Sequence, residues 1–385
     1  MKEMNALFSS YGTTVFEVMS RLAMEHNTIN LGQGFPDEEG PESLFEVLSA
    51  ATREFPNQYP PMLGVPELRK AVAHHNERFY GIEVDWEQEV MVSSGATESL
   101  AAAILALLNP GDEVVVFEPL YDCYLPMIAR AGAVARIVRL EPPTWSIPMD
   151  ALDAAFSERT KLLLINNPMN PTGKVFTEAE LSAIAELLRR YDAYAICDEV
   201  YEHLVFDGRQ HLPLMRLPGM RERCVRIGSA GKTFSMTGWK VGYMTGDASL
   251  LSVISKAHQF LVFTTPPNLQ RAVAHGLDNE EAWYTGLAPA LEAKRDLMSR
   301  ELARIGFDVL PCDSTYFMNA DFRPLGFTGN DVEFCRHLTI EAGVTVVPLS
   351  ALYAEDGYQH LVRFCFCKRY PVLEGALERL STHFS

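Results

Sequence analysis

The sequence predicts an α/β protein with a large domain, built on a mostly parallel sheet between helices, and a smaller α/β domain. Three observations predict this architecture. From residue 89 onward, short apolar strands alternate with helices, which is typical of parallel sheets covered on both faces. After about residue 275 the pattern changes to a long helical stretch followed by shorter strands. The chain has 385 residues, more than the roughly 250–300 at which a single core stops growing.

We expect three parts along the chain: an N-terminal arm with part of the small domain at residues 1–40, the large domain at 41–275, and the small C-terminal domain at 276–385. The arm contains an expected helix at 15–25. A turn with two glycines follows at 31–37, which is either a plain connection or a place where the backbone approaches a ligand closely.

The large domain begins with an amphipathic helix expected at 64–80. A short strand at 90–93 then leads through the small-residue loop 94–97 into a helix expected at 98–108. A strand that delivers such a loop to a helix N-terminus favours an anion site, because free backbone N–H groups and the helix dipole point at the loop. The stretch lacks a Walker lysine and the G-x-G-x-x-G spacing, so neither an NTPase nor a dinucleotide-binding fold is indicated.

Further apolar runs continue the large sheet, with helices between them. One of these helices is expected at 178–190, where Thr177 can cap it. The strands are expected at 113–117, 134–140, 161–166, 194–197, 225–228 and 241–245. The small domain is expected to have a helix at 280–305 and a final helix at 372–380. Its strands are expected at 307–310, 316–320, 344–348 and 361–366.

Charge and cysteine content exclude several classes of protein. A formal net charge of −17 argues against nucleic acid and anionic membranes as partners, because both require a basic face. The longest apolar run, residues 100–108, is far shorter than the roughly 20 residues that cross a bilayer, and residues 1–12 contain no apolar signal-peptide core. Seven scattered cysteines without a C-x-x-C motif favour free thiols over disulfides or zinc. We therefore expect a soluble, cytoplasmic protein without a metal site.

The stretch from Ser229 to Gly242 is the centre of the predicted site. It follows an apolar run at 224–227 and places Lys232 among small, uncharged residues, with Lys240 eight positions later. A lysine in such surroundings is a candidate nucleophile, because desolvation of its ammonium lowers its pKa. The alternative is a surface loop whose lysine is solvated.

Four further polar clusters lie within or just beyond expected strands. They are an amide-rich turn at 166–173, an acidic run at 198–201, the run 118–122 with Tyr121, and Arg363 within the apolar run 361–366. Asp198 at the end of an apolar strand needs a cationic or donor partner. An arginine inside an apolar strand suggests bidentate binding of a carboxylate. Taken singly, Tyr121 and Tyr201 are equally consistent with core aromatics.

Together these clusters resemble the fold-type I, pyridoxal-5′-phosphate-dependent aminotransferases of class I/II, over nearly the whole chain. The stretches 31–37, 231–235 with 237–242, and 363–366 are similar to the branch of kynurenine–oxoglutarate, glutamine-transaminase-K and bacterial methionine aminotransferases. The resemblance implies the PLP-dependent transferase fold with a sheet of the seven-stranded type. It also implies pyridoxal 5′-phosphate as cofactor, and a homodimer whose small-molecule partners are amino acids and 2-oxo acids.

The resemblance implies a role for each matching residue. Lys232 would form the Schiff base and move the proton, Asp198 would pair with the pyridine nitrogen, and Arg363 would bind the substrate α-carboxylate. The other cofactor contacts would come from Gly95, Ala96, Thr97, Tyr121, Asn170, Tyr201, Ser229 and Lys240. The partner subunit's Tyr59 would reach the phosphate. Gly34 and Asn170 would lie beside the substrate carboxylate.

We expect ping-pong transfer of an amino group between an L-amino acid and a 2-oxo acid. No second arginine can be placed to bind the side-chain carboxylate of aspartate, which favours a neutral side chain such as methionine, glutamine or a kynurenine-like aromatic. Two residues depart from the family pattern. Many class I members have arginine where this chain has Lys240, and the eukaryotic kynurenine enzymes have an aromatic residue where this chain has Thr97.

Two alternative functions remain. A β-lyase acting on cysteine S-conjugates or cystathionine would use the same chemistry at Cα. A cofactor-sensing regulator would need a DNA-binding segment, and the arm before Leu31 is too short to hold one.

Overall fold

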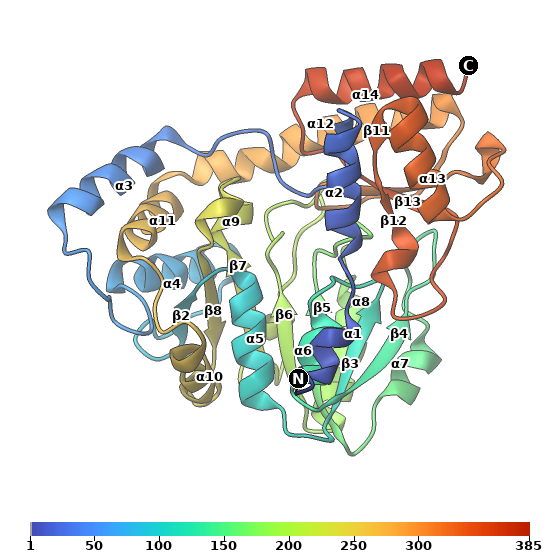
Figure 1. Cartoon of the computed structure of the whole chain (residues 1–385). Helices are drawn as coiled ribbons and strands as arrows, with labels where there is room; N and C mark the ends of the chain where they lie inside the picture. The colour runs from blue at the N-terminus through green and yellow to red at the C-terminus, as the bar shows by residue number, and fades with distance from the viewer. Residues whose placement is uncertain (1) are drawn as a thin grey trace.

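The computed structural model describes residues 2–385, and within them the chain builds one seven-stranded, one four-stranded and one two-stranded sheet (Figure 1). The seven-stranded sheet has the order β2-β8-β7-β6-β5-β3-β4. β8 runs antiparallel to both neighbours and the other pairs are parallel, which confirms the predicted mostly parallel sheet. Its strands are β2 (Val90–Ser93), β3 (Glu113–Glu118), β4 (Val134–Arg139), β5 (Thr160–Asn166), β6 (Tyr194–Asp198), β7 (Cys224–Ser229) and β8 (Gly242–Gly246).

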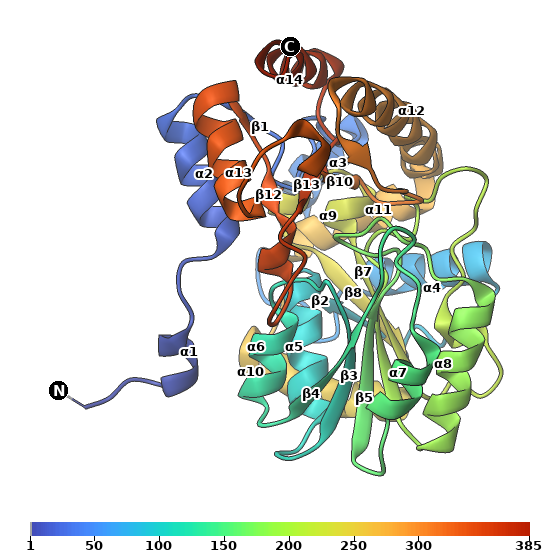
Figure 2. The same cartoon turned by 90° about the vertical axis from the view of Figure 1, so that its right-hand side faces the viewer.

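Helices cover both faces of this sheet (Figure 2). α5 (Ala96–Leu107), α6 (Tyr124–Arg130) and α10 (Ala248–Leu261) share one apolar core with the strands. α7 (Met149–Ala155) and α8 (Glu178–Arg190) contribute to a second core on the other face. Every residue of β2, β3 and β7 is buried, which explains why these strands are nearly continuous apolar runs in the sequence.

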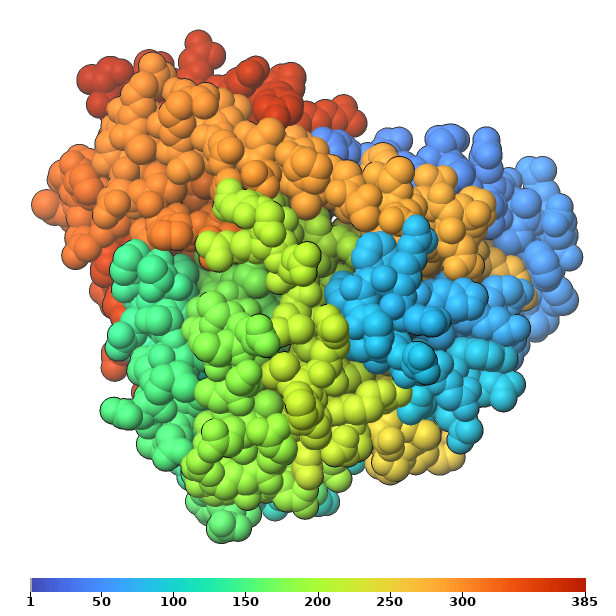
Figure 3. Space-filling view, turned by 180° about the vertical axis from the view of Figure 1, so that it is seen from behind, coloured from blue at the N-terminus to red at the C-terminus, as the bar shows by residue number. Residues whose placement is uncertain are grey.

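The four-stranded sheet has the order β12-β13-β10-β9 and is antiparallel throughout. Its strands are β9 (Asp308–Val309), β10 (Phe317–Asp321), β12 (Val347–Pro348) and β13 (Leu361–Cys365). α12 (Glu281–Ile305) packs against the C-terminal helix α14 (Tyr370–His383). From behind, the orange segment that contains α12 runs across the molecule between the red C-terminal helix and the segments around the large sheet (Figure 3).

The prediction of a single strand at residues 344–348 is wrong. The structure has two short strands here, β11 (Val344–Thr345) and β12. β11 pairs in parallel with β1 (Ile29–Asn30), whereas β12 pairs with β13, so the chain passes from one sheet to the other at Val346. An apolar run does not reveal which partner each of its residues takes.

The N-terminal arm lies against the C-terminal part of the chain. β1 pairs with β11, and α2 (Val15–Glu25) packs beside β11 and β12, with the bounds expected from the sequence. The division into parts at residues 40 and 275 stays a prediction, and Met1 lies outside the described residues.

The remaining helices complete the layers around the sheets. They are α1 (Ala6–Ser10), α3 (Glu42–Glu54), α4 (Pro66–Tyr80), α9 (Ala230–Thr233), α11 (Pro267–Asn279) and α13 (Asp331–His337). α5 begins at Ala96, two residues before its predicted start, because Gly95 takes the cap position. No helix in residues 2–385 combines the length and the apolar character needed to cross a membrane.

Candidate active site

A cavity of about 190 Å³ lies at the carboxyl ends of β5, β6 and β7. The last residues of these strands, Asn166, Asp198 and Ser229, all line it. Its other lining residues are Gly95, Ala96, Thr97, Leu100, Tyr121, Asn170, Val200, Tyr201, Gly231, Lys232, Thr237 and Lys240. Open, mostly parallel α/β sheets bind their ligands at this edge.

Asp198 supplies a buried acid to the cavity. Its Oδ2 accepts a hydrogen bond of 2.5 Å from the Tyr124 hydroxyl, and its backbone carbonyl accepts one of 2.9 Å from the Asn166 amide. Its Oδ1 is buried and has no hydrogen-bond partner within residues 2–385. Burial raises the pKa of Asp198 to about 6. The free oxygen can therefore accept a bond from a cationic N–H group of a ligand.

Lys232 enters the same cavity from the short helix α9. Its Nζ lies 5.7 Å from the ring centre of Tyr201 and 5.8 Å from that of Tyr316. Burial lowers the pKa of Lys232, because desolvation disfavours the ammonium form. An amine with a lowered pKa is a better nucleophile and can accept and return a proton near neutral pH.

Groups suited to an anion gather at the N-terminus of α5. Gly95 caps this helix with φ 79°, and no side chain takes the capping bond there, so the first N–H groups face the cavity. A Cβ added to Gly242 would lie 2.7 Å from the Gly95 carbonyl carbon, so only glycine allows β8 to pack this closely. Lys240, which also has a positive φ of 53°, lines the cavity beside Gly95.

Arg363 lies beside the cavity and is 2% exposed. Its Nη1 donates to Asn170 Oδ1 at 3.0 Å, and its Nη2 donates to the Gly32 carbonyl at 2.8 Å. The guanidinium carbon lies 4.1 Å from the ring centre of Phe317. Burial lowers the pKa of Arg363. Since a guanidinium has five N–H donors, these two bonds leave others for a carboxylate.

The structure brings most of the predicted site residues together. Ten of them line the cavity: Gly95, Ala96, Thr97, Tyr121, Asn170, Asp198, Tyr201, Ser229, Lys232 and Lys240. Arg363 reaches it through Asn170. The Gly34 carbonyl accepts from the Tyr316 hydroxyl at 3.0 Å, and its place beside a substrate carboxylate stays a prediction. Tyr59 lies outside the cavity, is 80% exposed and contacts Phe263, so its role toward a partner subunit stays a prediction.

Several site residues could not be identified from the sequence. Tyr124 bonds to Asp198, Tyr316 lies near Lys232, and Thr237 lines the cavity. Tyr124 follows Tyr121 by three residues, a spacing that places two side chains on neighbouring positions of a helical turn and was the only indication for it.

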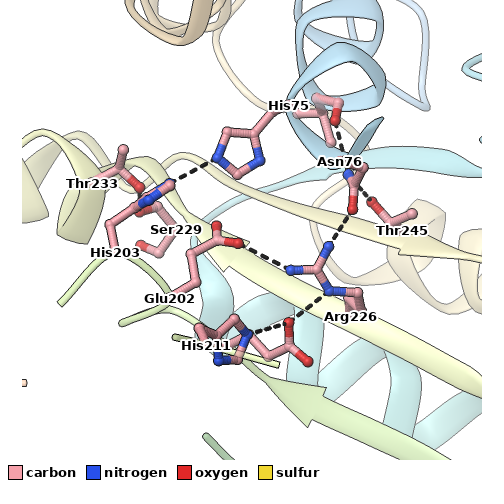
Figure 4. A network of polar contacts seen from close by, with 11 residues as sticks. His75, Asn76, Glu202, His203, His211, Arg226, Ser229, Thr233 and Thr245 are labelled. Carbon is pink, nitrogen blue, oxygen red and sulfur yellow. Dashed lines mark hydrogen bonds and ion pairs between the residues drawn. The ribbon is translucent and has the colours of Figure 1, made fainter. Parts of the chain in front are cut away.

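A buried polar network holds the turn after β6 against β7 and α4 (Figure 4). Arg226 of β7 donates to Glu199 at 2.6 Å, to Glu202 at 3.0 Å and to Asn76 of α4. His211 contacts the same Glu199 carboxylate at 3.0 Å. Because Asp198 ends β6 and Tyr201 lies in the turn that follows, the network positions both of them toward the cavity.

The same network contains three potential metal ligands, and they form the one such group found in residues 2–385. These residues are His75, Glu202 and His203, and their donor atoms lie within 4.8 Å of one another. The two imidazoles share a hydrogen bond of 2.8 Å, and Glu202 is bonded to Arg226. Burial lowers the pKa of His203 to about 3, which keeps its ring neutral. These atoms therefore already have partners, and we assign them to the polar network.

Comparisons with known proteins agree on one family. The family described as "Aminotransferase class I and II" matches residues 26–380. The chain is 45% identical over 382 residues to a probable N-succinyldiaminopimelate aminotransferase of Mycobacterium tuberculosis, with 96% of each protein covered. It is 42% identical over 369 residues to the methionine aminotransferase of Escherichia coli, covering 96% of this chain and 95% of that protein. A kynurenine–oxoglutarate transaminase of Dictyostelium discoideum is 37% identical over 411 residues, covering 97% and 94%.

A solved structure leads to the same family. The structure of the N-succinyldiaminopimelate aminotransferase from Mycobacterium tuberculosis matches this fold with a TM-score of 0.96 and 45% identity, covering 99% of this chain and 100% of that chain.

Proposed function

The chain belongs to the class I and II aminotransferases, and on that premise we propose that it moves an amino group between an L-amino acid with a neutral side chain and a 2-oxo acid. It is an enzyme, its cofactor is pyridoxal 5′-phosphate, and its relatives include the methionine and kynurenine–oxoglutarate branch that the sequence resembles. The neutral side chain, the roles of individual residues, the homodimer and the cytoplasmic location are parts of the proposal.

The cavity has a suitable group for each end of the cofactor. The unpaired Oδ1 of Asp198 is the buried acceptor that a protonated pyridine nitrogen requires. The N-terminus of α5, with Ser229 and Lys240, fits the phosphate. Tyr121 would cover the ring face, and Asn170 and Tyr201 would bond to the phenolic oxygen. Bound in this way, the cofactor supplies an electron-withdrawing ring to the carbon that loses a proton.

The side chains then divide the reaction between them. Arg363 would hold the α-carboxylate of the amino acid and so orient the Cα–H bond. Lys232 Nζ would take the proton from Cα and return it on the other side of the transferred nitrogen, a task that the lowered pKa of this lysine favours. Burial of the cavity keeps water away from the proton between these two steps.

The observation that carries the proposal is that Lys232 and the unpaired oxygen of Asp198 belong to one cavity, which the N-terminus of α5 also lines. Reduction of the cofactor-loaded protein with borohydride should fix the cofactor on the peptide that contains Lys232. The variant Lys232→Ala should lose transamination by several orders of magnitude. Cofactor fixed on another peptide, or turnover by K232A near the wild-type rate, would refute the assignment.

The neutral side chain is proposed because the cations lining the cavity in the described residues are two lysines, with no arginine among them to bind a second carboxylate. A panel of amino donors with one common 2-oxo acid should give higher kcat/KM for methionine, glutamine or aromatic amino acids than for aspartate. Aspartate as the best donor would contradict the proposal. N-succinyldiaminopimelate belongs in the same panel because one relative carries that name.

The reaction products distinguish the β-lyase alternative from transamination. Cysteine S-conjugates incubated without a 2-oxo acid should release little pyruvate or thiol, since the proposed reaction requires an amino acceptor. Continuous release at the rate of transamination would favour the lyase.

A further inference from the structure

Cys365 and Cys367 form a pair of thiols at the end of β13. Their Sγ atoms lie 3.2 Å apart, and both residues are buried. Alternate residues of an extended chain share one face, so Phe366 points away from the pair. We use the name thiol pair for these two residues. The C-x-C spacing in the sequence does not show that the two sulfur atoms meet.

Cationic groups surround the thiol pair. Arg363 precedes it on the same strand and Lys368 follows it directly. Burial raises the pKa of the Cys365 thiol, but the bond from Cys367 and the charges of Arg363 and Lys368 hold that pKa below its ordinary value. Burial raises the pKa of the Cys367 thiol. Cys365 is therefore the sulfur that more readily becomes a thiolate, and Cys367 is the one that keeps its proton, an arrangement suited to attack on an oxidant followed by resolution.

A small cavity reaches Cys367 of the thiol pair. Cys367 and Lys232 line a cavity of about 20 Å³ that also reaches Glu38, whose side chain is 40% exposed. A volume of this size admits a molecule only slightly larger than water. Hydrogen peroxide fits this description, whereas glutathione disulfide does not.

The thiol pair lies where the N-terminal arm is bonded to β13. The Cys365 N–H donates to the Leu31 carbonyl at 2.8 Å, and the Asp37 N–H donates to the Cys367 carbonyl at 3.4 Å. In the sequence, Gly32 lies between Leu31 and Asp37, and its carbonyl accepts a hydrogen bond from Arg363. The sulfur atoms of a disulfide are about 2.0 Å apart, so closing the pair brings them about 1 Å nearer and moves the backbone to which the arm and Arg363 are bonded.

We propose that the thiol pair is an oxidative modification site, at which hydrogen peroxide forms a Cys365–Cys367 disulfide that weakens binding of the substrate carboxylate. In the first step one thiolate attacks a peroxide oxygen, the O–O bond breaks, and the hydroxide released takes the proton of the second thiol. In the second step that sulfur attacks the sulfenic sulfur, the S–S bond forms and the S–O bond breaks, and the hydroxide leaves as water with a proton from solvent. Two thiols are oxidised by two electrons and one peroxide is reduced to two waters.

The test follows the tryptic peptide 364–368, which contains both cysteines, after peroxide treatment of the cofactor-loaded full chain. The peptide should lose about 2 Da and resist iodoacetamide until dithiothreitol is added. The KM for the amino acid should rise by roughly tenfold or more and recover on reduction, because a misplacement of about 1 Å can cost up to about 10² in rate. The effect on KM rests on the proposed role of Arg363.

Two variants distinguish the thiol pair from other thiols. Cys367→Ala should form no disulfide in this peptide, and its KM should not respond to peroxide. Cys335→Ala, which removes another buried cysteine from α13, should respond like the wild type.

Free alkylation of both cysteines after treatment, or an equal response in C367A, would overturn the proposal. A disulfide that forms without a change in KM would contradict its effect on binding. The peptide masses report on the thiol pair even if no amino group is transferred, so a failure of the proposed function is recognised separately.

Discussion

Asp198 has one carboxylate oxygen bonded to Tyr124 and the other buried without a partner in the described residues. Burial therefore raises its pKa from 3.8 to about 6. Because the folded-state value is the higher one, the folded protein binds more protons than the unfolded chain between these two pH values. The Asp198 carboxyl therefore contributes to the stability of the cofactor-free protein below pH 3.8, and this contribution is lost as the pH rises through about 6.

We expect the substitution Asp198→Asn to remove this pH dependence. The free energy of unfolding of cofactor-free D198N, relative to the wild type, should increase by about 2–3 kcal/mol between about pH 4 and pH 8, since each unit of pKa shift is worth about 1.4 kcal/mol. Urea unfolding across this range measures the difference. With cofactor bound, D198N should instead be less stable than the wild type, because the variant lacks the negative charge that pairs with the ring nitrogen.

Asp247 provides a control of opposite sign. Hydrogen bonds from Ser249 hold the pKa of this carboxyl below its ordinary value. The stability that it contributes is present above pH 3.8 and is lost as the pH falls below that value, so D247N relative to the wild type should show a slope of opposite sign below pH 3.8 and little change between pH 4 and pH 8. A D198N protein whose stability relative to the wild type is independent of pH would contradict the buried, unpaired state of Asp198.

At the scale of secondary-structure elements, Arg226 joins β7 to the turn after β6. We expect Arg226→Leu to destabilise the protein by about 3–5 kcal/mol, because Glu199 and Glu202 would be left buried without their cation. Urea unfolding gives this value. Replacing both glutamates by glutamine in the same chain should recover part of the loss.

The matched control for Arg226 is Arg190, whose ion pairs with Asp153 and Glu186 lie on the surface, with the arginine side chain 48% exposed. Arg190→Leu should cost far less than Arg226→Leu, because water screens exposed ion pairs. Similar losses in the two variants would show that burial of the network contributes little.

The close packing of β8 against the N-terminus of α5 gives a second expectation at this scale. A Cβ at Gly242 would lie 2.7 Å and 2.8 Å from backbone atoms of Gly95 and Ala96. We expect Gly242→Ala to displace this loop and lower the affinity for the cofactor phosphate by about tenfold or more, a loss of about 1.4 kcal/mol, measured by equilibrium dialysis. Gly238→Ala, whose Cβ would meet nothing within 4 Å, should leave the affinity unchanged.

The strands of the large sheet could be predicted because burial on both faces makes them continuous apolar runs. The helices α3, α10 and α11 were not expected, although each has the pattern of apolar residues on one face that predicts the helix at 64–80, so the sequence did contain a signal for them. The chain's change of sheet at Val346 depends on which strands lie beside it, and a run of valines contains no information on that point.

The candidate site could be predicted as a set of motifs and only partly as a set of contacts. Lys232, Asp198 and Asn170 follow strands whose carboxyl ends meet, so their common cavity follows from the order of the elements. The bond from Arg363 to Gly32 depends on how the arm crosses β13. Such a tertiary contact has no counterpart in local spacing.

At the scale of the whole molecule, large apolar side chains lie exposed at and just after the end of α10, and Tyr59 contacts one of them. Tyr59 is 80% exposed and contacts Phe263, and Phe260, at the end of the same α10 segment, is 85% exposed. The first helix, α1, projects from the side of the molecule and has no buried residue (Figure 2). Exposed apolar surface of this kind favours an interface, and a second copy of the chain is the partner that the family resemblance implies.

We expect sedimentation analysis to show a dimer and Phe260→Asp to shift it toward the monomer with weaker cofactor binding, because a charge at the centre of an apolar contact must be desolvated. Met24→Asp is the matched control. Met24 is 77% exposed on α2 and does not belong to the exposed apolar residues at the end of α10, so its substitution should leave the dimer intact.

The role of Tyr59 is tested by mixing two impaired variants. Lys232→Ala lacks the amine but keeps Tyr59, and Tyr59→Ala keeps the amine. If the partner subunit's Tyr59 completes each site, a hybrid dimer has one intact site, and full exchange of subunits should restore about a quarter of the wild-type sites in a twofold-symmetric dimer. If Tyr59 served the site of its own chain, no hybrid site would be intact, and the mixture would show only the residual activity of Y59A. The amount of cofactor retained after dialysis of the mixture distinguishes these results independently of turnover.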